Sequence, residues 1–571
     1  MESCNIESGS TKSPADTSPV SAGCNIATTL TERAAQHPLS HAVVYPHRRD
    51  SYGRVSYTHL TYAQLEADSN KVALALHRYG IHAGQRTVLM LPPGLDFFTL
   101  TFALFKLGAI PVLIDPGMGI KNLKQCLEQV KPQVFIGNLK ANLARQILGW
   151  GKGSLRHCIT TSSMVLPCTA RLQELLRHTP STFNFTPYAP SVGSLAAILF
   201  TSGSTGPAKG TEYTHENFFA QIESLKQLYA IEAGEIDLCT FPLFALFAPA
   251  LGMTAVVPDM DASKPGQVNP ERIFEALDNF HISNMFGSPA LLRRVATYGC
   301  RQGRKLPSLK RVICAGAPVP AQILRQMESM LNPKAQIFTP YGATEALPVS
   351  SIGSHEILSS TAGKTDMGGG ICIGRPVASI DVQIIRISDD AIPSWDDVAL
   401  LQPGSTGEIC VRGPQVTSGY YQLEQATRSA KIYTDKSTFY HRMGDVGYMD
   451  EEGLLWFCGR KNHRVETAES TLFTIPCEAV FNLHPQVART ALVGCGARGK
   501  QRAVVCVELN PDVSAQQHAS IIADLKAIQQ QYPHTAEIST FLIHPQFPVD
   551  VRHNAKIFRE QLALWAHERL A

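Results

Sequence analysis

The chain is organised around residues 198–216, which read Ile-Leu-Phe-Thr-Ser-Gly-Ser-Thr-Gly-Pro-Ala-Lys-Gly-Thr-Glu-Tyr-Thr-His-Glu. The apolar run Leu195–Phe200 is typical of a buried strand, and it leads directly into a loop rich in hydroxyl side chains and glycine. Glycine lets the backbone approach an anion closely, and successive N–H groups can then surround a polyphosphate. Lys209 adds a positive charge. A phosphate-binding loop is therefore predicted, although its spacing is not that of a Walker loop.

Length and composition limit the classes of protein that fit. A chain of 571 residues should hold more than one domain, because single cores rarely exceed roughly 250–300 residues. A content of 44% hydrophobic and 17% charged residues is that of an ordinary soluble globular protein. The net charge of +3 argues against nucleic acid as a partner. The 14 cysteines lack disulfide or zinc-ligand spacing, which favours reduced thiols in a cytosolic enzyme.

Two further stretches bear on localisation. Residues 1–27 are rich in Ser, Thr, Pro and Gly and contain no apolar core, so we expect a disordered leader rather than a signal peptide. Residues 241–258 are free of charge, but Pro242, Pro249 and Gly252 argue against a membrane helix. The pattern indicates a buried segment that lines an apolar cavity.

The first part of the chain predicts an α/β fold. Thr61 precedes an amphipathic helix expected over 63–79, and another helix is expected over 97–107. Short apolar strands alternate with such helices; they are expected at 87–91, 109–114, 134–136, 195–200, 239–241, 284–286 and 311–315. This alternation is typical of parallel sheets, in which ligands bind at the carboxyl ends of strands.

The pattern changes after Gly374. Short strands expected at 380–387, 407–412 and 453–458 indicate a small β-subdomain. Beyond Arg460, strands expected at 490–493 and 504–508 and helices at 516–532 and 558–569 indicate a compact α+β unit. We therefore predict a leader over 1–27, a large N-terminal domain over 28–460 and a smaller C-terminal domain over 461–571, whose mobility is implied only by the resemblance described below.

Several other motifs accompany the glycine-rich loop. They are Ala315-Gly316-Ala317-Pro318, Tyr341-Gly342-Ala343-Thr344-Glu345, Gly407-Glu408 with Gly419-Tyr420, Gly444-Asp445, Gly459-Arg460 and Asn554-Ala555-Lys556-Ile557. In content and order these motifs resemble those of the AMP-forming adenylating enzymes. That superfamily includes acyl-CoA synthetases, peptide-synthetase adenylation domains and luciferases.

The resemblance implies ATP and Mg²⁺ as cofactors and a large adenylate-forming domain followed by a smaller one. It implies catalytic roles for Lys209, Thr344, Glu345 and Lys556, with Glu345 as the Mg²⁺ ligand. It implies nucleotide contacts for a larger set of residues: Thr201, Ser202, Gly203, Ser204, Thr205, Gly206, Gly316, Ala317, Pro318, Tyr341, Gly342, Asp445 and Arg460. A carboxylate such as Asp445 can accept both ribose hydroxyls, and Asn462 falls at the hinge position of the family.

The implied first step joins a carboxylate to the α-phosphate of ATP. Since both groups are anions, their repulsion must be neutralised by fixed positive charge. Mg²⁺, Lys556 and the loop amides would supply that charge. The products would be an acyl-adenylate and pyrophosphate.

Two stretches depart from the usual acyl-CoA ligase pattern. Those ligases usually have Pro-Leu-Phe-His, whereas here Pro242-Leu243-Phe244 is followed by Ala245. They also present a Gly-Gly loop along which pantetheine slides, whereas residues 466–473 contain no glycine. A bulkier loop there would hinder a pantetheine tunnel.

The amino-acid sequences of residues 112–119, 241–252 and 456–467 are similar to those of the β-lactone synthetases of bacterial long-chain olefin biosynthesis. This resemblance implies a long-chain 2-alkyl-3-hydroxy fatty acid as substrate. After adenylation, its own 3-hydroxyl would attack the activated carbonyl, which expels AMP and closes a β-lactone. An intramolecular nucleophile is held close to the carbonyl and needs no second substrate site. His215, His441 and His463 are candidates for the base.

Other functions stay open on the sequence alone. They are a long-chain fatty acyl-CoA ligase, a fatty acyl-AMP ligase that serves a carrier protein, a stand-alone adenylation module of peptide synthesis, and a non-catalytic acyl- or nucleotide-binding relative. Composition and charge predict a cytoplasmic enzyme with no nucleic-acid partner and no transmembrane segment, and the resemblance implies association with other enzymes of the olefin pathway.

Overall fold

The computed structural model describes residues 24–180, 185–200, 208–549 and 557–570. Its first large sheet has seven strands in the order β7-β6-β5-β3-β4-β8-β9. All neighbours in it are parallel except β9, which runs antiparallel to β8. In chain order the strands are β3 (Arg86–Met90), β4 (Ile110–Ile114), β5 (Val134–Gly137), β6 (His157–Thr160), β7 (Ala170–Arg171), β8 (Leu195–Phe200) and β9 (Gly210–Thr214).

The second sheet has fourteen strands and combines a parallel half with an antiparallel half. The parallel half contains β1 (His41–Arg49), β10 (Ile236–Cys239), β11 (Thr254–Val256), β12 (Asn284–Gly287), β13 (Arg311–Cys314) and β14 (Gln336–Ala343), with β2 (Val55–Thr61) antiparallel at its edge. The antiparallel half contains β15 (Ala346–Gly353), β16 (Ile371–Pro376), β17 (Asp381–Ile385), β18 (Gly407–Arg412), β19 (Lys431–Tyr433), β20 (Phe439–Met449) and β21 (Leu455–Arg460). The β-subdomain expected after Gly374 is therefore present, but its strands continue the sheet of the α/β half.

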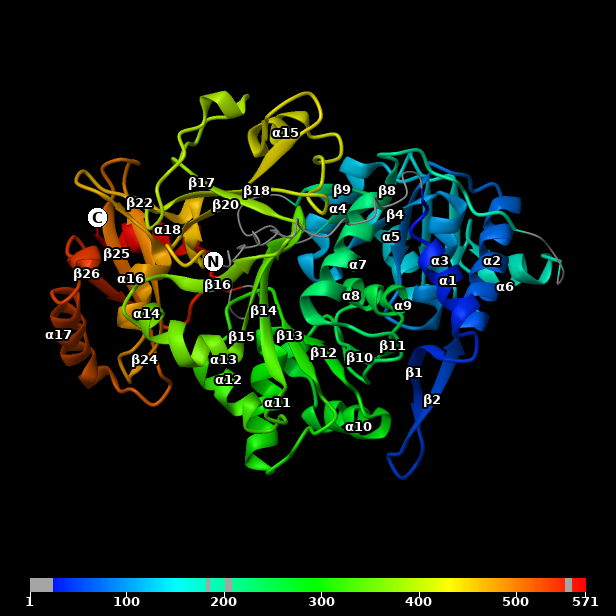
Figure 1. Ribbon diagram of the computed structural model, residues 1–571, viewed down its shortest axis with the longest axis horizontal. Coiled ribbons are helices and arrows are strands. Elements are labelled where there is room, and N and C mark those ends of the chain that lie inside the picture. Colours follow the sequence, from blue (N-terminus) through cyan, green and yellow to red (C-terminus); the bar gives the residue numbers. More distant parts are fainter. Residues whose placement is uncertain (1–23, 181–184, 201–207, 550–556, 571) are drawn as a thin grey trace, which may run out of the picture.

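Helices cover and separate these sheets (Figure 1). Thr61 caps α2 through a capping box with Gln64, as its position before an amphipathic run predicts. Helix α7 contacts both β9 of the first sheet and β15 of the second, so it lies between them. The helices of this part are α1 (Thr28–Gln36), α2 (Tyr62–Arg78), α3 (Leu95–Leu107), α4 (Ile120–Val130), α5 (Leu139–Leu148), α6 (Leu172–Arg177), α7 (His215–Tyr229), α8 (Pro242–Ala245), α9 (Phe247–Leu251), α10 (Pro270–Phe280), α11 (Pro289–Arg301), α12 (Ala321–Glu328), α13 (Ser354–Glu356), α14 (Ala362–Asp366) and α15 (Glu424–Ala430).

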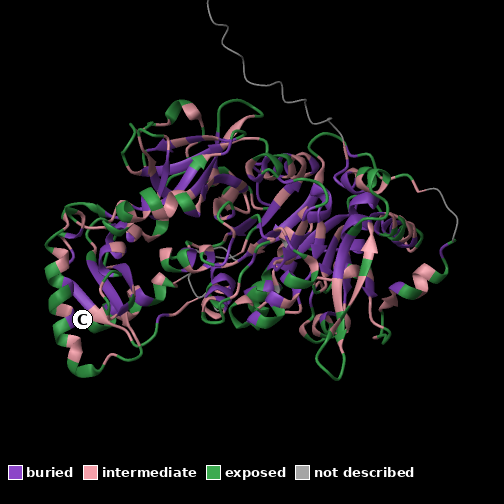
Figure 2. Ribbon diagram, turned by 60° about the horizontal axis from the view of Figure 1, so that its bottom comes forward, coloured by how far each residue is buried: buried purple, intermediate pink, exposed green. Residues whose placement is uncertain are grey.

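The C-terminal part has a core of its own, shown in orange and red in Figure 1. A three-stranded sheet of β24 (Val487–Cys495), β25 (Arg502–Leu509) and β26 (Thr540–Ile543) packs against α16 (Thr474–Phe481), α17 (His518–Gln529) and α18 (Arg559–Leu570). The short hairpin β22 (Val465–Glu466) and β23 (Thr471–Leu472) precedes it. Figure 2 shows the buried residues concentrated on the sheets of both parts. The mixed α/β architecture is as predicted.

Two expectations need correction. The predicted leader ends too late, because Asn25, Ile26 and Ala27 are buried and packed against the first core; residues 1–23 lie outside the described part. The strand expected at 239–241 instead ends at Cys239, since Pro242 begins a short helix three residues later. Within the described residues, no helix is long and apolar enough to cross a membrane.

Candidate active site

A cavity of about 1070 Å³ lies where the strands of the two sheets end. Asp115 lines it just beyond β4, Thr240 beyond β10, Ser288 beyond β12 and Gly316 beyond β13. These are the carboxyl ends of parallel strands, where ligands bind in open α/β sheets. The alternation of strands and helices in the sequence thus predicted the location of the cavity.

Some of the residues predicted to bind the nucleotide line this cavity. Lys209, Gly316, Gly342, Thr344, Glu345 and Arg460 line it, whereas Ala317, Pro318, Tyr341 and Asp445 do not. The loop residues Thr201, Ser202, Gly203, Ser204, Thr205 and Gly206, and also Lys556, lie outside the described residues. Their roles, like those of the residues in the cavity, stay predictions.

Backbone geometry explains the glycines of this set. Gly316 has φ of +101°, a left-handed conformation that strongly favours glycine. At Gly342, a Cβ would stand 2.6 Å from the carbonyl oxygen of Ala346, closer than any side chain tolerates. Both positions therefore need glycine to keep the backbone beside the cavity in this course.

Glu345 is held by two residues of the connection between β18 and α15. Its carboxylate Oε1 accepts a hydrogen bond from the Tyr420 hydroxyl at 2.7 Å, and its carbonyl oxygen accepts the Thr417 N–H at 2.9 Å. The Lys209 ammonium lies 4.7 Å from the centre of the Tyr420 ring, a cation–π contact. The tyrosine thus joins the lysine of the phosphate loop to the predicted metal ligand. The sequence motif contained Tyr420 but gave it no role.

Lys431 is a second cation close to Glu345, and sequence reasoning missed it. It is 1% exposed, and its ammonium donates to the carbonyl oxygen of Thr417, the residue whose N–H is bonded to Glu345. Burial lowers the pKa of Lys431 to about 7, an effect that the negative charge of Glu345 partly offsets. A lone lysine at the end of a helical segment carries no sequence signal of such burial.

Asp445 is buried beside Arg460 and Tyr341. Its Oδ2 accepts the Tyr341 hydroxyl at 2.6 Å, and Arg460 Nη1 lies 2.9 Å from its Oδ1. Burial raises the pKa of Asp445, although the positive charge of Arg460 opposes that shift. Oδ1 is buried against the Arg460 guanidinium, and a carboxylate oxygen with one such partner can accept one more donor. A ribose hydroxyl would suit that capacity, although Asp445 does not itself line the cavity.

The three candidate histidines occupy different surroundings. His441 lines the cavity, and its Nδ1 is buried without a hydrogen-bond partner. Burial and the charges of Lys431 and Lys209 lower the pKa of His441 well below its usual value, so the ring is neutral and Nδ1 can accept from a hydroxyl. His215 Nδ1 already accepts the N–H of Ile26 at 3.1 Å. His463 lies 3.3 Å from Glu560, outside the cavity lining.

One arm of the cavity is apolar, as predicted for residues 241–258. Phe241, Phe244, Leu246, Phe247 and Ala250 contribute to it, and Phe244 stacks on Phe286 with ring centres 4.2 Å apart. Ala245 is buried at the place of the histidine that acyl-CoA ligases usually carry. The arm is therefore suited to alkyl groups.

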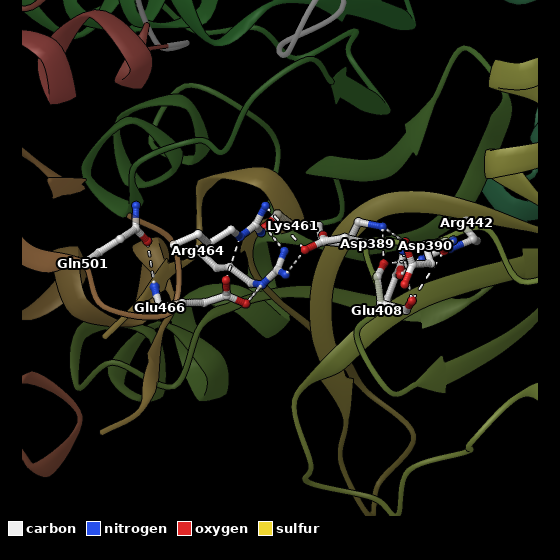
Figure 3. Close-up of polar contacts among 10 residues, drawn as sticks. Asp389, Asp390, Glu408, Arg442, Lys461, Arg464, Glu466 and Gln501 are labelled. Carbon is white, nitrogen blue, oxygen red and sulfur yellow. Dashed lines mark hydrogen bonds and ion pairs between the residues drawn. The ribbon is translucent and has the colours of Figure 1, made fainter. Parts of the chain in front are cut away.

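A network of charged groups lies at the junction of the two parts (Figure 3), and its members Glu408, Arg442 and Lys461 line the cavity. Glu408, fully buried, pairs with Arg442 at 2.7 Å and with Lys461 at 2.9 Å. Next to it, Asp389 pairs with Arg464 at 2.8 Å. Because Lys461 and Arg464 follow the last strand of the large part, these contacts fix the start of the C-terminal part against β18 and the β17–β18 connection.

Residues 466–473, where the sequence predicted a loop bulkier than that of acyl-CoA ligases, include most of the hairpin of β22 and β23. Thr467 and Ser470 both donate to the carboxylate of Glu537, which holds the turn in place. Residues 466–473 do not line the cavity. Among the described residues, no group of three or more side chains of the kinds that hold a metal ion occurs.

Comparison with known proteins identifies the class. The family model of AMP-binding enzymes matches residues 30–421, and the chain belongs to this family of enzymes. The chain is also 46% identical over 551 residues to the olefin beta-lactone synthetase of Xanthomonas campestris pv. campestris, which covers 96% of this chain and 98% of that protein. This identity confirms the resemblance noted from the sequence motifs.

Solved structures confirm the fold. The anthranilate CoA ligase AuaEII in complex with anthranoyl-AMP superposes with a TM-score of 0.77, 16% identity and coverage of 97% of this chain and 100% of that one. The O-succinylbenzoate coenzyme A synthetase of Bacillus subtilis, in complex with ATP and magnesium ion, gives a TM-score of 0.71, 20% identity and coverage of 94% and 98%.

Proposed function

We propose that this protein is a β-lactone synthetase, which activates a long-chain 2-alkyl-3-hydroxy fatty acid with ATP and then closes it to a β-lactone. The observation that carries the proposal is the single cavity that joins Lys209, Thr344, Glu345 and Arg460 to an apolar arm. It occurs in a chain 46% identical to an olefin beta-lactone synthetase over nearly its whole length.

In the first step the carboxylate of the acid attacks the α-phosphate, the bond to the β-phosphate breaks, and pyrophosphate leaves. Lys209 and Arg460 bring positive charge to the cavity in which negative charge develops. Glu345 fits a Mg²⁺ ion, because its carboxylate lines the cavity and hard cations combine one or two carboxylates with substrate phosphates. Bound there, Mg²⁺ would neutralise phosphate charge. Lys556 is proposed as a further cation on the α-phosphate.

In the second step the 3-hydroxyl attacks the acyl carbon, the bond from that carbon to the AMP oxygen breaks, and the hydroxyl loses its proton. His441 lines the cavity and its buried Nδ1 has no hydrogen-bond partner, which supports His441 as the base for this hydroxyl. The nucleophile belongs to the acylated molecule itself, so proximity offsets much of the entropic cost of ring closure. The apolar arm would hold the alkyl groups out of water.

A product assay tests the proposal. Enzyme, Mg-ATP and a 2-alkyl-3-hydroxy fatty acid are incubated with and without CoA, and the products are identified by mass spectrometry. A product lighter than the acid by one water, formed without CoA, is expected. An acyl-CoA that forms only when CoA is added would contradict the proposal and return the protein to the acyl-CoA ligases.

The resemblance also supports a cytoplasmic location and association with the enzymes that make the hydroxy acid and use the lactone. Co-purification of those enzymes with the tagged protein from its native cells would test the association. Recovery of the protein alone would contradict it.

A further inference from the structure

The N-terminal segment reaches the apolar arm of the cavity. Ile26 and Thr29 line the arm together with Phe102, Phe105 and Phe218. We propose that residues 25–29 form the end wall of the acyl pocket and set the length of alkyl chain that the enzyme accepts. This proposal rests on the proposed function, because it takes the ligand of the apolar arm to be an alkyl chain. Its new content is the identity of the residues that limit the length of that chain.

The segment is fastened at several points, as an end wall requires. Asn25 is 3% exposed, and its Nδ2 donates to the carbonyl oxygens of Phe105 at 2.7 Å and Tyr188 at 3.0 Å. Its Oδ1 accepts the N–H of Ala27 at 3.0 Å, which folds the segment back on itself. The anchors lie on α3 and on the stretch before β8, so movement of the segment would break buried hydrogen bonds.

His215 provides another anchor, which explains its burial. Its Nδ1 accepts the N–H of Ile26 at 3.1 Å, and the residue is 3% exposed. Burial lowers the pKa of His215 to about 4, so the ring stays neutral and keeps this acceptor. His215 therefore acts as a positioning residue for Ile26, at the start of α7, and is not available as the base of lactone closure.

A continuous series of contacts connects this wall to the predicted nucleotide site. The Tyr213 hydroxyl donates to the carbonyl oxygen of Thr344, and the Tyr213 ring stacks on Phe218 at 5.0 Å. Phe218 lies 5.8 Å from Phe105, whose ring is 6.3 Å from that of His215. Thr344, Tyr213, Phe218, Phe105 and Ile26 all line the cavity, so these contacts connect the predicted nucleotide site with Ile26 along the cavity lining. In the proposal, the acyl chain takes this path.

We expect the length of the substrate's alkyl chain to be limited at the end of this path, at Ile26. A chain that stops at Ile26 buries all of its methylene groups, whereas a longer one must displace a segment held by buried hydrogen bonds. Packed apolar pockets discriminate about 10-fold or more per misplaced methylene. A larger side chain at position 26 should therefore exclude the longest acids and leave the shorter ones.

The test is a length profile measured by pyrophosphate release, which reports acid activation whether or not a lactone forms. Ile26→Trp and Ile26→Ala are compared with the wild type on 2-alkyl-3-hydroxy acids of increasing alkyl length. The matched control is Ile147→Trp, the same change on α5 at a residue that is 73% exposed. We expect Ile26→Trp to lower kcat/KM for the longest accepted acid by about 10-fold and to leave short acids within about twofold. Ile26→Ala should move the optimum to longer acids.

An equal loss at every length, or an unchanged profile in both Ile26 variants, would overturn the inference. If Ile26→Trp fails to fold, Asn25→Ala provides a second test. This change removes the side-chain hydrogen bonds of Asn25 that hold residues 25–29 and adds no bulk to the pocket, so the enzyme should accept longer acids. A shifted profile without any lactone product would sustain the end wall and refute only the proposed second step.

Discussion

Asp445 is the residue to which the sequence motifs assign the ribose of the nucleotide. One of its carboxylate oxygens accepts from Tyr341, while the other is paired with Arg460 at 2.9 Å. The ion pair sets the orientation of the carboxylate, and a carboxylate oxygen with one partner can accept a second donor such as a ribose hydroxyl. The contact that the sequence motif predicts is thus compatible with the geometry, although Asp445 lies behind the cavity wall.

Replacing Asp445 by asparagine should raise the KM for ATP, because the amide presents a donor where an acceptor is needed. Loss of a hydrogen bond to a charged group corresponds to about 10-fold or more in affinity. The measurement is pyrophosphate release against ATP concentration, with Asp366→Asn on exposed α14 as control. An unchanged KM would remove the ribose role of Asp445.

Lys431 should make stability depend on pH. Burial lowers its pKa from 10.5 to about 7 in the folded state, so between pH 7 and about 10 the unfolded chain binds more protons than the folded one. Stability contributed by this residue therefore rises with pH across that window, by up to about 1.4 kcal/mol per pH unit. Below pH 7 both states are protonated, and the burial cost is present in full.

The variant Lys431→Met should lose that dependence, since methionine does not titrate and is of similar length. Urea unfolding of both proteins at several pH values between 7 and 9 gives the free energy of unfolding for the comparison. Parallel pH profiles for the wild type and the variant would show that Lys431 is charged in the folded state.

At the scale of elements, the connection between β17 and β18 holds the two parts of the chain together. In this connection, the backbone carbonyl oxygen of Ser388 accepts hydrogen bonds from both Arg442 and Lys461, and the carboxylate of Asp389 pairs with Arg464. Fully buried Glu408 on β18 completes the network shown in Figure 3. The network therefore has one buried end, on β18, and one half-exposed end, at Asp389.

These two ends should differ sharply in energy. Glu408→Gln leaves Arg442 and Lys461 without their buried counter-charge, which should cost about 3–5 kcal/mol of unfolding free energy. Asp389→Asn weakens two pairs, with Arg464 and Arg498, at a carboxylate that is 48% exposed, which should cost less than about 1 kcal/mol for each pair. Thermal or urea unfolding measures both, and similar losses would show that the buried pair is not the stronger constraint.

At the scale of the whole molecule, the question is whether the C-terminal part must rotate between the two steps. Asn462 lies in a single 3-10 turn, Lys461–His463, directly after β21, and it lines the cavity. In the proposed second step, the acyl group is transferred to the substrate's own 3-hydroxyl. Such a reaction needs no separate tunnel for a second substrate such as the pantetheine of CoA. One arrangement of the two parts could therefore serve both adenylation and ring closure.

Asn462→Pro tests this, because proline fixes φ at the hinge and is tolerated in the first turn of a helix, where N–H groups lack intrahelical partners. We expect both pyrophosphate release and lactone formation to persist. If pyrophosphate is still released but the lactone is lost, then rotation about Asn462 is part of the second step.

Several local structural features of this protein, and its family, could be predicted from the sequence alone. The capping box at Thr61, the strand Leu195–Phe200 and the glycines at 316 and 342 follow from hydrogen bonding and steric limits between near neighbours. The order of the motifs predicted the family that the comparisons then confirmed. Each of these features depends on residues close together in the chain.

Only the tertiary structure decided which distant groups meet. Ile26 and His215, separated by 189 positions, are joined by a buried hydrogen bond, and Lys431 reaches Thr417 and the surroundings of Glu345. The sequence pattern around residues 1–27 predicted disorder, yet Asn25–Ala27 become a buried wall because α3 and α7 offer them partners. Burial and pairing across the fold depend on the positions of all the elements at once, and no local pattern records them.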